Sequence, residues 1–134
     1  MSDAASVAPL RVVAVTYSPG DSLPVFLESL GKATDRPVDV VLADNGSTDG
    51  APEEAAQRYP HVRVLRTGGN VGYGAAVNAG LAGLTEGYAV VANPDVRFEP
   101  GSVDELLAVA ARWPRAATVG PAIRTPEGEL YPSA

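Results

Sequence analysis

The chain has 134 residues, of which 46% are hydrophobic and 19% charged, so its length and composition suit one globular domain rather than a disordered segment. Ten basic against sixteen acidic side chains leave a net charge of −6, which argues against a nucleic-acid partner. There is no cysteine and one histidine, which excludes disulfide bonds and thiolate or multi-histidine zinc sites. Any metal must therefore bind through oxygen ligands.

The start of the chain gives an expectation about location. Residues 1–10 contain an acidic side chain and lack both a basic start and a continuous apolar stretch, so they do not read as a secretory signal. No run of about 18 apolar residues occurs in the sequence. We expect a cytoplasmic protein with a flexible N-terminus at residues 1–10 and one domain at residues 11–134.

Strands and helices are predicted to alternate along the chain. Short β-branched or apolar runs predict strands at residues 11–17, 38–43, 62–65 and 88–92, with a fifth at 116–119. Apolar residues at helical spacing predict helices at residues 22–31, 51–58, 75–84 and 102–112. Ser102 and Glu105 have capping-box spacing, and Thr125 to Gly128 has the composition of a turn.

This alternation predicts a three-layer α/β/α fold with a mostly parallel sheet. Ligands of such folds bind beyond the carboxyl ends of the strands. Polar residues follow three of the predicted strands, so three strand ends are expected to converge on one crevice. These residues are Thr16 and Tyr17, Asp44 and Asn45, and Asn93 and Asp95.

Asp44 opens a polar segment, Asp44 to Gly50, between a strand and a helix. At the rim of a crevice its carboxylate could accept a strong hydrogen bond from the imide N–H of a pyrimidine base. The alternative is that the segment is a local turn closed by Asp44, with Asp49 capping the following helix. The residues alone leave both interpretations open for Asp44 and favour the cap for Asp49.

A glycine-rich loop, Gly68 to Gly74, joins a predicted strand to a predicted helix. Its glycines could let a pyrophosphate approach backbone N–H groups at the helix start, although an ordinary turn is the more common explanation. The loop matches neither a Rossmann nor a Walker motif. Asn78 lies eight residues after Asn70, on roughly the same side of the helix, where it could brace the loop, face solvent or reach a ligand.

Asn93-Pro94-Asp95 directly follows an apolar strand, and Pro94 prevents regular strand pairing from continuing. Two oxygen-bearing side chains are thereby presented past a strand end. Mg²⁺ or Mn²⁺ can bind to one or two such oxygens when a diphosphate and water complete its ligand shell. The alternative is a proline turn with polar flanks.

Taken in order, these segments resemble glycosyltransferase family 2: residues 13–17, 42–50, 70–78 and 93–95. The resemblance implies a GT-A fold, of which this chain is the N-terminal nucleotide-sugar-binding part, and an inverting transfer from a dTDP- or UDP-sugar. It places Asp95 as the ligand of Mg²⁺ or Mn²⁺, because Asn93 replaces the first carboxylate of the family's Asp-x-Asp motif. The donor-binding residues that it implies are Thr16, Tyr17, Asp44, Asn45, Asn70, Gly72, Asn78 and Asn93.

The Asn-Pro-Asp variant is similar to the rhamnosyltransferase branch of that family, which uses dTDP-rhamnose. The stretch from residue 112 to residue 134 resembles actinobacterial members that act in cell-wall synthesis. This implies a lipid-linked or saccharide acceptor and peripheral association with the inner face of the plasma membrane.

The catalytic base stays unassigned. The family places it in a downstream acidic motif, and the carboxylates at positions 104, 105, 127 and 129 do not resemble that motif. Two alternatives remain: a non-catalytic nucleotide-binding or assembly module, and a sugar-nucleotide nucleotidyltransferase. The second lacks the basic glycine-rich loop that it would need after the first strand.

Overall fold

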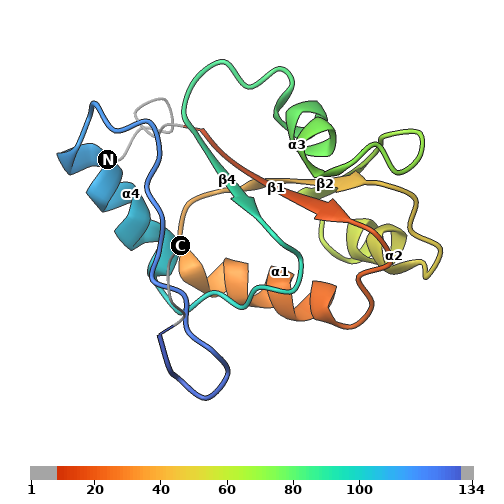
Figure 1. Ribbon diagram of the computed structural model, residues 1–134, viewed down its shortest axis with the longest axis horizontal. Helices are drawn as coiled ribbons and strands as arrows, with labels where there is room; N and C mark the ends of the chain where they lie inside the picture. The colour runs from red at the N-terminus through yellow and green to blue at the C-terminus, as the bar shows by residue number, and fades with distance from the viewer. Residues whose placement is uncertain (1–8, 131–134) are drawn as a thin grey trace.

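The computed structural model describes residues 9–130, which form a four-stranded parallel sheet with helices on both faces (Figure 1). The strand order is β3-β2-β1-β4, so β1 pairs with both β2 and β4. The predicted three-layer α/β arrangement is therefore confirmed. The elements are β1 (Leu10–Thr16), α1 (Ser22–Ala33), β2 (Asp39–Asp44), α2 (Ala51–Arg58), β3 (Val62–Arg66), α3 (Tyr73–Leu81), β4 (Tyr88–Ala92) and α4 (Ser102–Arg112).

The central strands β1 and β2 are covered on both faces. Val12 belongs to the larger apolar cluster, whereas its neighbour Val13 belongs to the smaller one on the opposite face, and each is fully buried. A continuous β-branched run, rather than an alternating pattern, is what a strand buried on both faces requires. The polar side chains at the ends of β1 and β2 are thus fixed to the most rigid part of the fold.

The helices are divided unequally between the two faces. Leu30 of α1, Ala55 of α2 and Leu107 of α4 pack in the larger cluster, and Ala76 of α3 packs in the smaller one. Figure 1 shows α3 on one side of the sheet and α1 on the other. None of the helices among residues 9–130 is long and apolar enough to cross a membrane.

Most predicted boundaries agree with the structure to within two residues, and α3 differs most. It begins at Tyr73 rather than at residue 75, and it ends at Leu81 rather than at residue 84. The helix stops because Ala82 is extended and Gly83 has a φ of 84°. At the N-terminus, β1 already begins at the buried Leu10, and residues 1–8 of the expected flexible segment lie outside the described residues.

The predicted capping box at the start of α4 is wrong. The N-cap residue is Gly101, with a φ of 74°, and Ser102 is the first helical residue. The buried Ser102 hydroxyl has no hydrogen-bond partner among the described residues. The backbone at the cap adopts a left-handed conformation that suits glycine, which moves the expected cap serine one position into the helix.

The predicted fifth strand at residues 116–119 is also wrong. These residues are exposed and form no strand pairing in the described chain. A short strand is stable only when its backbone pairs and one face is buried, and this run gains neither. The predicted turn is confirmed: the Gly128 amide donates to the Thr125 carbonyl at 2.9 Å, and an antiparallel bridge joins Arg124 to Leu130. Figure 1 shows this turn projecting away from the sheet.

Gly80 allows α3 to pack closely on β1, and its replacement is expected to destabilise the fold. A Cβ at this position would lie 2.5 Å from Cγ1 of the buried Val13. We expect Gly80→Ala to lower the free energy of unfolding by about 1 kcal/mol, because overpacking outweighs the better helix propensity of alanine. Gly74→Ala in the same helix is the control, since a Cβ there meets nothing within 4 Å. Equal free energies of unfolding for Gly80→Ala and Gly74→Ala, measured in urea, would contradict this close packing.

Candidate functional site

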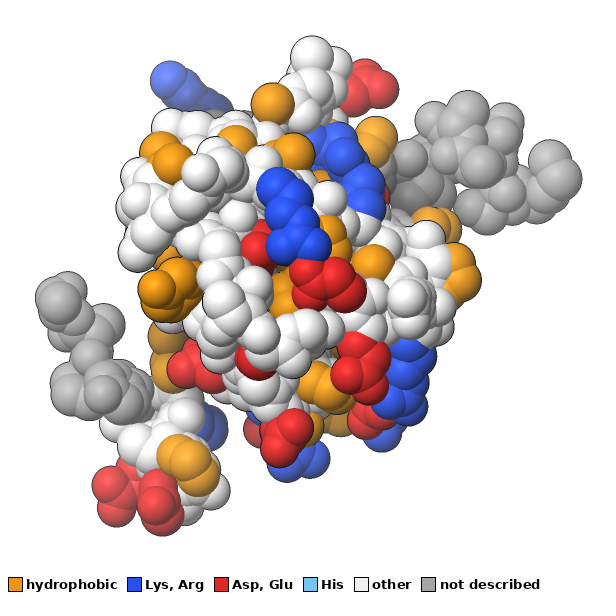
Figure 2. Space-filling model, turned by 90° about the vertical axis from the view of Figure 1, so that its right-hand side faces the viewer, with side chains coloured by type: hydrophobic (Ala, Val, Ile, Leu, Met, Phe, Trp, Pro, Cys, Tyr) orange, Lys and Arg blue, Asp and Glu red, His pale blue; other side chains and the backbone are white. Residues whose placement is uncertain are grey.

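The carboxyl ends of β1, β2 and β4 lie at one edge of the sheet, as predicted. In the parallel register Thr16 pairs with Asp44, and Ala14 pairs with Ala92, the last residue of β4. Strands β2 and β3 lie on one side of β1, and β4 lies on the other. The strand order therefore reverses between β1 and β4, which is where ligands of such sheets bind. Figure 2 views the molecule from the side to which these strands point and shows basic and acidic side chains next to one another at its centre.

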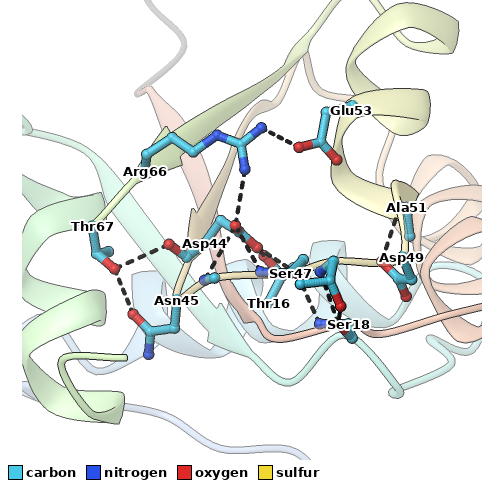
Figure 3. Close-up of polar contacts among 12 residues, drawn as sticks. Thr16, Ser18, Asp44, Asn45, Ser47, Asp49, Ala51, Glu53, Arg66 and Thr67 are labelled. Atoms are coloured by element: carbon cyan, nitrogen blue, oxygen red, sulfur yellow. Dashed lines mark hydrogen bonds and ion pairs between the residues drawn. The ribbon is translucent and has the colours of Figure 1, made fainter. Parts of the chain in front are cut away.

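Asp44 is the centre of a buried polar cluster (Figure 3). Its Oδ1 accepts hydrogen bonds from the hydroxyls of Thr16 at 2.7 Å and Ser47 at 2.5 Å. Its Oδ2 accepts from the amides of Gly46 at 3.3 Å and Ser47 at 3.1 Å, and from Arg66 Nη1 at 3.2 Å. The local turn closed by Asp44 is thus present, and a role of Asp44 toward a base stays a prediction. The expected position at the rim is wrong, because Asp44 is 1% exposed and its carboxylate turns back toward the chain that follows it.

The surroundings of Asp44 favour its ionised form. Burial by itself raises the pKa of the Asp44 carboxyl. The hydrogen bonds from the side chains of Ser47 and Thr16 and from two backbone amides outweigh that effect, so the pKa lies below its ordinary value. Asp44 is therefore ionised at neutral pH and acts as a charged hydrogen-bond acceptor.

A depressed pKa in the folded state predicts a loss of stability in acid. The contribution of Asp44 is fully present above its unfolded pKa of about 3.9 and is lost as the pH falls through the lower folded pKa. We expect the free energy of unfolding, measured in urea, to fall below about pH 4, and to fall less steeply in Asp44→Asn. Some acid sensitivity remains in that variant, because a hydrogen bond from Arg63 lowers the pKa of Asp39 as well. Equal slopes for the two proteins would contradict the assignment.

Asn45 links the loop after β2 to the glycine-rich loop after β3. The side chain is 4% exposed, and its Nδ2 donates to the Gly72 carbonyl at 3.2 Å and to Asn70 Oδ1 at 3.5 Å. Its Oδ1 accepts from the Thr67 hydroxyl at 2.7 Å. Gly72 has a φ of 89°, a conformation that favours glycine. Both polar ends of Asn45 are used inside the protein, so the residue shapes this loop.

The other predicted site residues are exposed. Tyr17 is 64% exposed, and Asn78, Asn93 and Asp95 also face solvent. Asn93 lies just past β4, where its carbonyl accepts the Val96 amide at 3.2 Å and closes a turn. Within residues 9–130, no polar contact joins Asn78, Asn93 or Asp95 to the Asp44 cluster. The structure thus brings five of the nine predicted residues together: Thr16, Asp44, Asn45, Asn70 and Gly72. The other four are exposed to solvent.

Two charged residues of the site were not predicted. Arg66, the last residue of β3, donates to Asp44 and also to Glu53 in the first turn of α2. The register pairs Asp44 with Arg66, so opposite charges at the ends of adjacent strands were the available signal. Asp49 was expected to cap α2, and this is wrong, because the N-cap is Gly50 and no side chain caps the helix. Asp49 lies one residue earlier, where its Oδ1 accepts the Ala51 amide at 3.0 Å and forms a local turn.

The chain can be assigned to a family once this geometry is known. Residues 11–133, more than half of the chain, match the family described as glycosyl transferase family 2. The chain belongs to this family. The membership confirms the resemblance carried by the sequence motifs and removes support from the nucleotidyltransferase alternative.

One curated relative of this family 2 chain is N-acetylglucosaminyl-diphospho-decaprenol L-rhamnosyltransferase of Mycobacterium tuberculosis. The identity is 58% over 93% of this chain and 44% of the relative, in both strains CDC 1551 / Oshkosh and ATCC 25618 / H37Rv. The chain thus spans less than half the length of that relative. For this chain, the activity of the whole relative is therefore a proposal.

Two solved structures share the fold. The mannosyltransferase PcManGT from Pyrobaculum calidifontis, in complex with GDP-Man and Mn²⁺, gives a TM-score of 0.63 and 25% identity over 90% of this chain and 37% of that one. TarS of S. aureus, residues 1–349, gives a TM-score of 0.67 and 22% identity over 78% of this chain and 32% of that one. These likenesses confirm the GT-A type of fold for the family 2 chain.

Proposed function

We propose that this chain forms the donor-binding part of an inverting glycosyltransferase that moves L-rhamnose from dTDP-rhamnose to a lipid-linked acceptor. The observation that carries the proposal is the 58% identity, over 93% of the chain, to an L-rhamnosyltransferase named for N-acetylglucosaminyl-diphospho-decaprenol. The proposal locates the reaction at the inner face of the plasma membrane, where a lipid-linked acceptor is expected. Transfer by the whole protein is part of the proposal, because this chain covers 44% of the relative.

The arrangement at the strand ends supports a pyrimidine nucleotide as the donor. Asp44 is an ionised acceptor of the kind that an imide N–H needs, and Thr16 fixes it from the neighbouring strand. The exposed Tyr17 follows directly and offers an aromatic ring at the same edge. The glycine-rich loop held by Asn45 starts α3, where backbone N–H groups suit a phosphate. Asn70 and Asn78 lie in and after this loop and complete the proposed donor pocket.

The residues past β4 fit a divalent cation that the donor itself helps to bind. Asn93 and Asp95 are exposed, and their side chains make no hydrogen bond with other described residues. Within residues 9–130 there is no group of three or more acidic or histidine side chains that could hold a metal alone. Mg²⁺ and Mn²⁺ accept one or two protein oxygens when a diphosphate and water supply the rest. Asp95 would hold the ion, and Asn93 would contact the donor or supply an amide oxygen. When bound, the ion would stabilise the departing diphosphate.

No described carboxylate is proposed as the catalytic base. Asp104, in the first turn of α4, accepts a hydrogen bond from the Thr34 hydroxyl at 2.6 Å. Thr34 follows α1 and precedes β2, so this pair lies toward the end of the sheet where the strands begin. The role of this chain in the proposal is therefore binding and orientation of the donor.

Isothermal titration calorimetry with dTDP in the presence of Mg²⁺ tests the proposed function. We expect dTDP to bind with a Kd between about 1 μM and 1 mM, a range typical of enzyme substrates. ADP is the control, because adenine carries an acceptor at N1 and no ring N–H on the edge that would face Asp44. A folded sample that binds no dTDP, or that binds ADP equally well, would overturn the proposal.

A further inference from the structure

The carboxylate of Asp44 is saturated with hydrogen bonds. Five donors from the described residues reach its two oxygens, two at Oδ1 and three at Oδ2. An ionised carboxylate offers about four lone-pair sites. A ligand N–H can therefore reach Asp44 only if one of the donors already present adjusts its position.

Arg66 is the donor that can adjust at the lowest cost. Thr16 is fully buried, and the amides of Gly46 and Ser47 belong to the backbone of the turn. The Arg66 side chain is 55% exposed and reaches Asp44 through a single N–H at 3.2 Å. One such bond does not fix the plane of a guanidinium on a long side chain. A second partner is needed to hold it.

Glu53 is that second partner. Its Oε2 accepts from Arg66 Nη2, and Figure 3 shows the guanidinium between the carboxylates of Glu53 and Asp44. The other oxygen, Oε1, is buried and has no partner among the described residues. The Glu53 side chain as a whole is 42% exposed, so the ion pair lies at the surface of the cluster. The place of Glu53 in the first turn of α2 fixes the direction from which its carboxylate reaches Arg66.

We propose that Glu53 is a positioning residue for the nucleotide base, and that it acts through Arg66 on Asp44. The inference rests on the proposed function, because it concerns the same donor. Glu53 keeps the guanidinium at the edge of the Asp44 carboxylate, where it neutralises charge without closing over the acceptor. Without Glu53, Arg66 turns fully onto Asp44 and closes over the oxygen that the base would use, which weakens the binding of the base.

A double-mutant cycle on dTDP affinity tests this coupling. Calorimetry compares the unmodified chain with Glu53→Ala, Arg66→Ala and the double variant. We expect Glu53→Ala to weaken dTDP binding about 5- to 20-fold, a range typical of coupling between contacting residues. In the Arg66→Ala background the same substitution is expected to have no effect, because the residue through which Glu53 acts is gone.

Two further variants separate positioning from general effects. Glu54→Ala removes the same charge from the same turn of α2, at an exposed residue, and is expected to leave dTDP affinity unchanged. Glu53→Gln retains an acceptor oxygen for Arg66 and is expected to restore part of the affinity. Equal thermal unfolding temperatures of Glu53→Ala and Glu54→Ala would show that the loss of affinity is not a loss of fold.

The outcomes distinguish this inference from the proposed function. If the unmodified chain binds no dTDP, the proposed function fails and this inference fails with it. If it binds dTDP but Glu53→Ala binds equally well, the inference alone is wrong. Effects of Glu53→Ala and Arg66→Ala that simply add would likewise show that Glu53 does not act through Arg66.

Discussion

Replacing Asp44 with Asn is expected to lower the free energy of unfolding by about 2 to 4 kcal/mol and to abolish dTDP binding. The substitution keeps the shape of the side chain but replaces one acceptor oxygen with an NH₂ group, which then faces donors. Thr16, Ser47 and Arg66 would each lose the charged acceptor that Asp44, 1% exposed, now provides. Urea unfolding followed by circular dichroism gives the stability, and calorimetry gives the affinity.

Asp49→Asn is the matched control for Asp44. This carboxylate lies in the same segment, but it is exposed and accepts two backbone amides, those of Gly20 and Ala51. Losing exposed hydrogen bonds of this kind costs about 1 kcal/mol, and dTDP affinity is expected to persist. If Asp44→Asn were as stable as Asp49→Asn, the buried hydrogen bonds would not be holding the strand ends together. If it were as stable and also bound dTDP normally, Asp44 would have no role in the site.

The sheet could be predicted from the sequence because its signals are local and agree with one another. The run 11–17 is β-branched and continuous, and β2 repeats the pattern, which is what strands covered on both faces require. The helix at 51–58 was predicted to the residue, since proline and glycine mark its start. The strand prediction for residues 116–119 was wrong for the opposite reason. A strand forms only beside a neighbouring strand, and no local pattern shows whether such a neighbour exists.

The site was predicted less completely than the sheet. Thr16, Asp44 and Asn45 could be located because a strand end is a local feature of the sequence. Their inward direction could not, because it depends on hydrogen bonds to hydroxyls and amides that the chain brings together only on folding. Arg66 offered one weak signal, a charge opposite to that of Asp44 at the end of the next strand, because an arginine at a strand end is ordinarily a solvated charge. The register of β2 against β3 brings Arg66 to Asp44, and only the contact with Arg66 makes Glu53 of α2 part of the site.

Asp95→Ala is expected to remove the dependence of dTDP binding on Mg²⁺. In the unmodified chain we expect Mg²⁺ to strengthen binding roughly 30-fold, which is about 2 kcal/mol, because the ion links the carboxylate to the diphosphate. Asp95 is exposed and has no hydrogen-bond partner among the described residues, so its removal should leave the fold intact. Calorimetry with dTDP, with Mg²⁺ and with a chelator, measures the difference for each protein.

Asn93→Asp gives the complementary result at the other end of the same tripeptide. A second carboxylate attracts a cation more strongly than a neutral amide does, so this variant is expected to bind Mg²⁺ more tightly and to show a larger effect of the ion on dTDP affinity. In the absence of the ion the added negative charge repels the diphosphate, and binding should weaken. Opposite changes in Asp95→Ala and Asn93→Asp would identify the ion as the link between β4 and the donor. If instead the two variants respond to Mg²⁺ as the unmodified chain does, the cation is not bound at this turn.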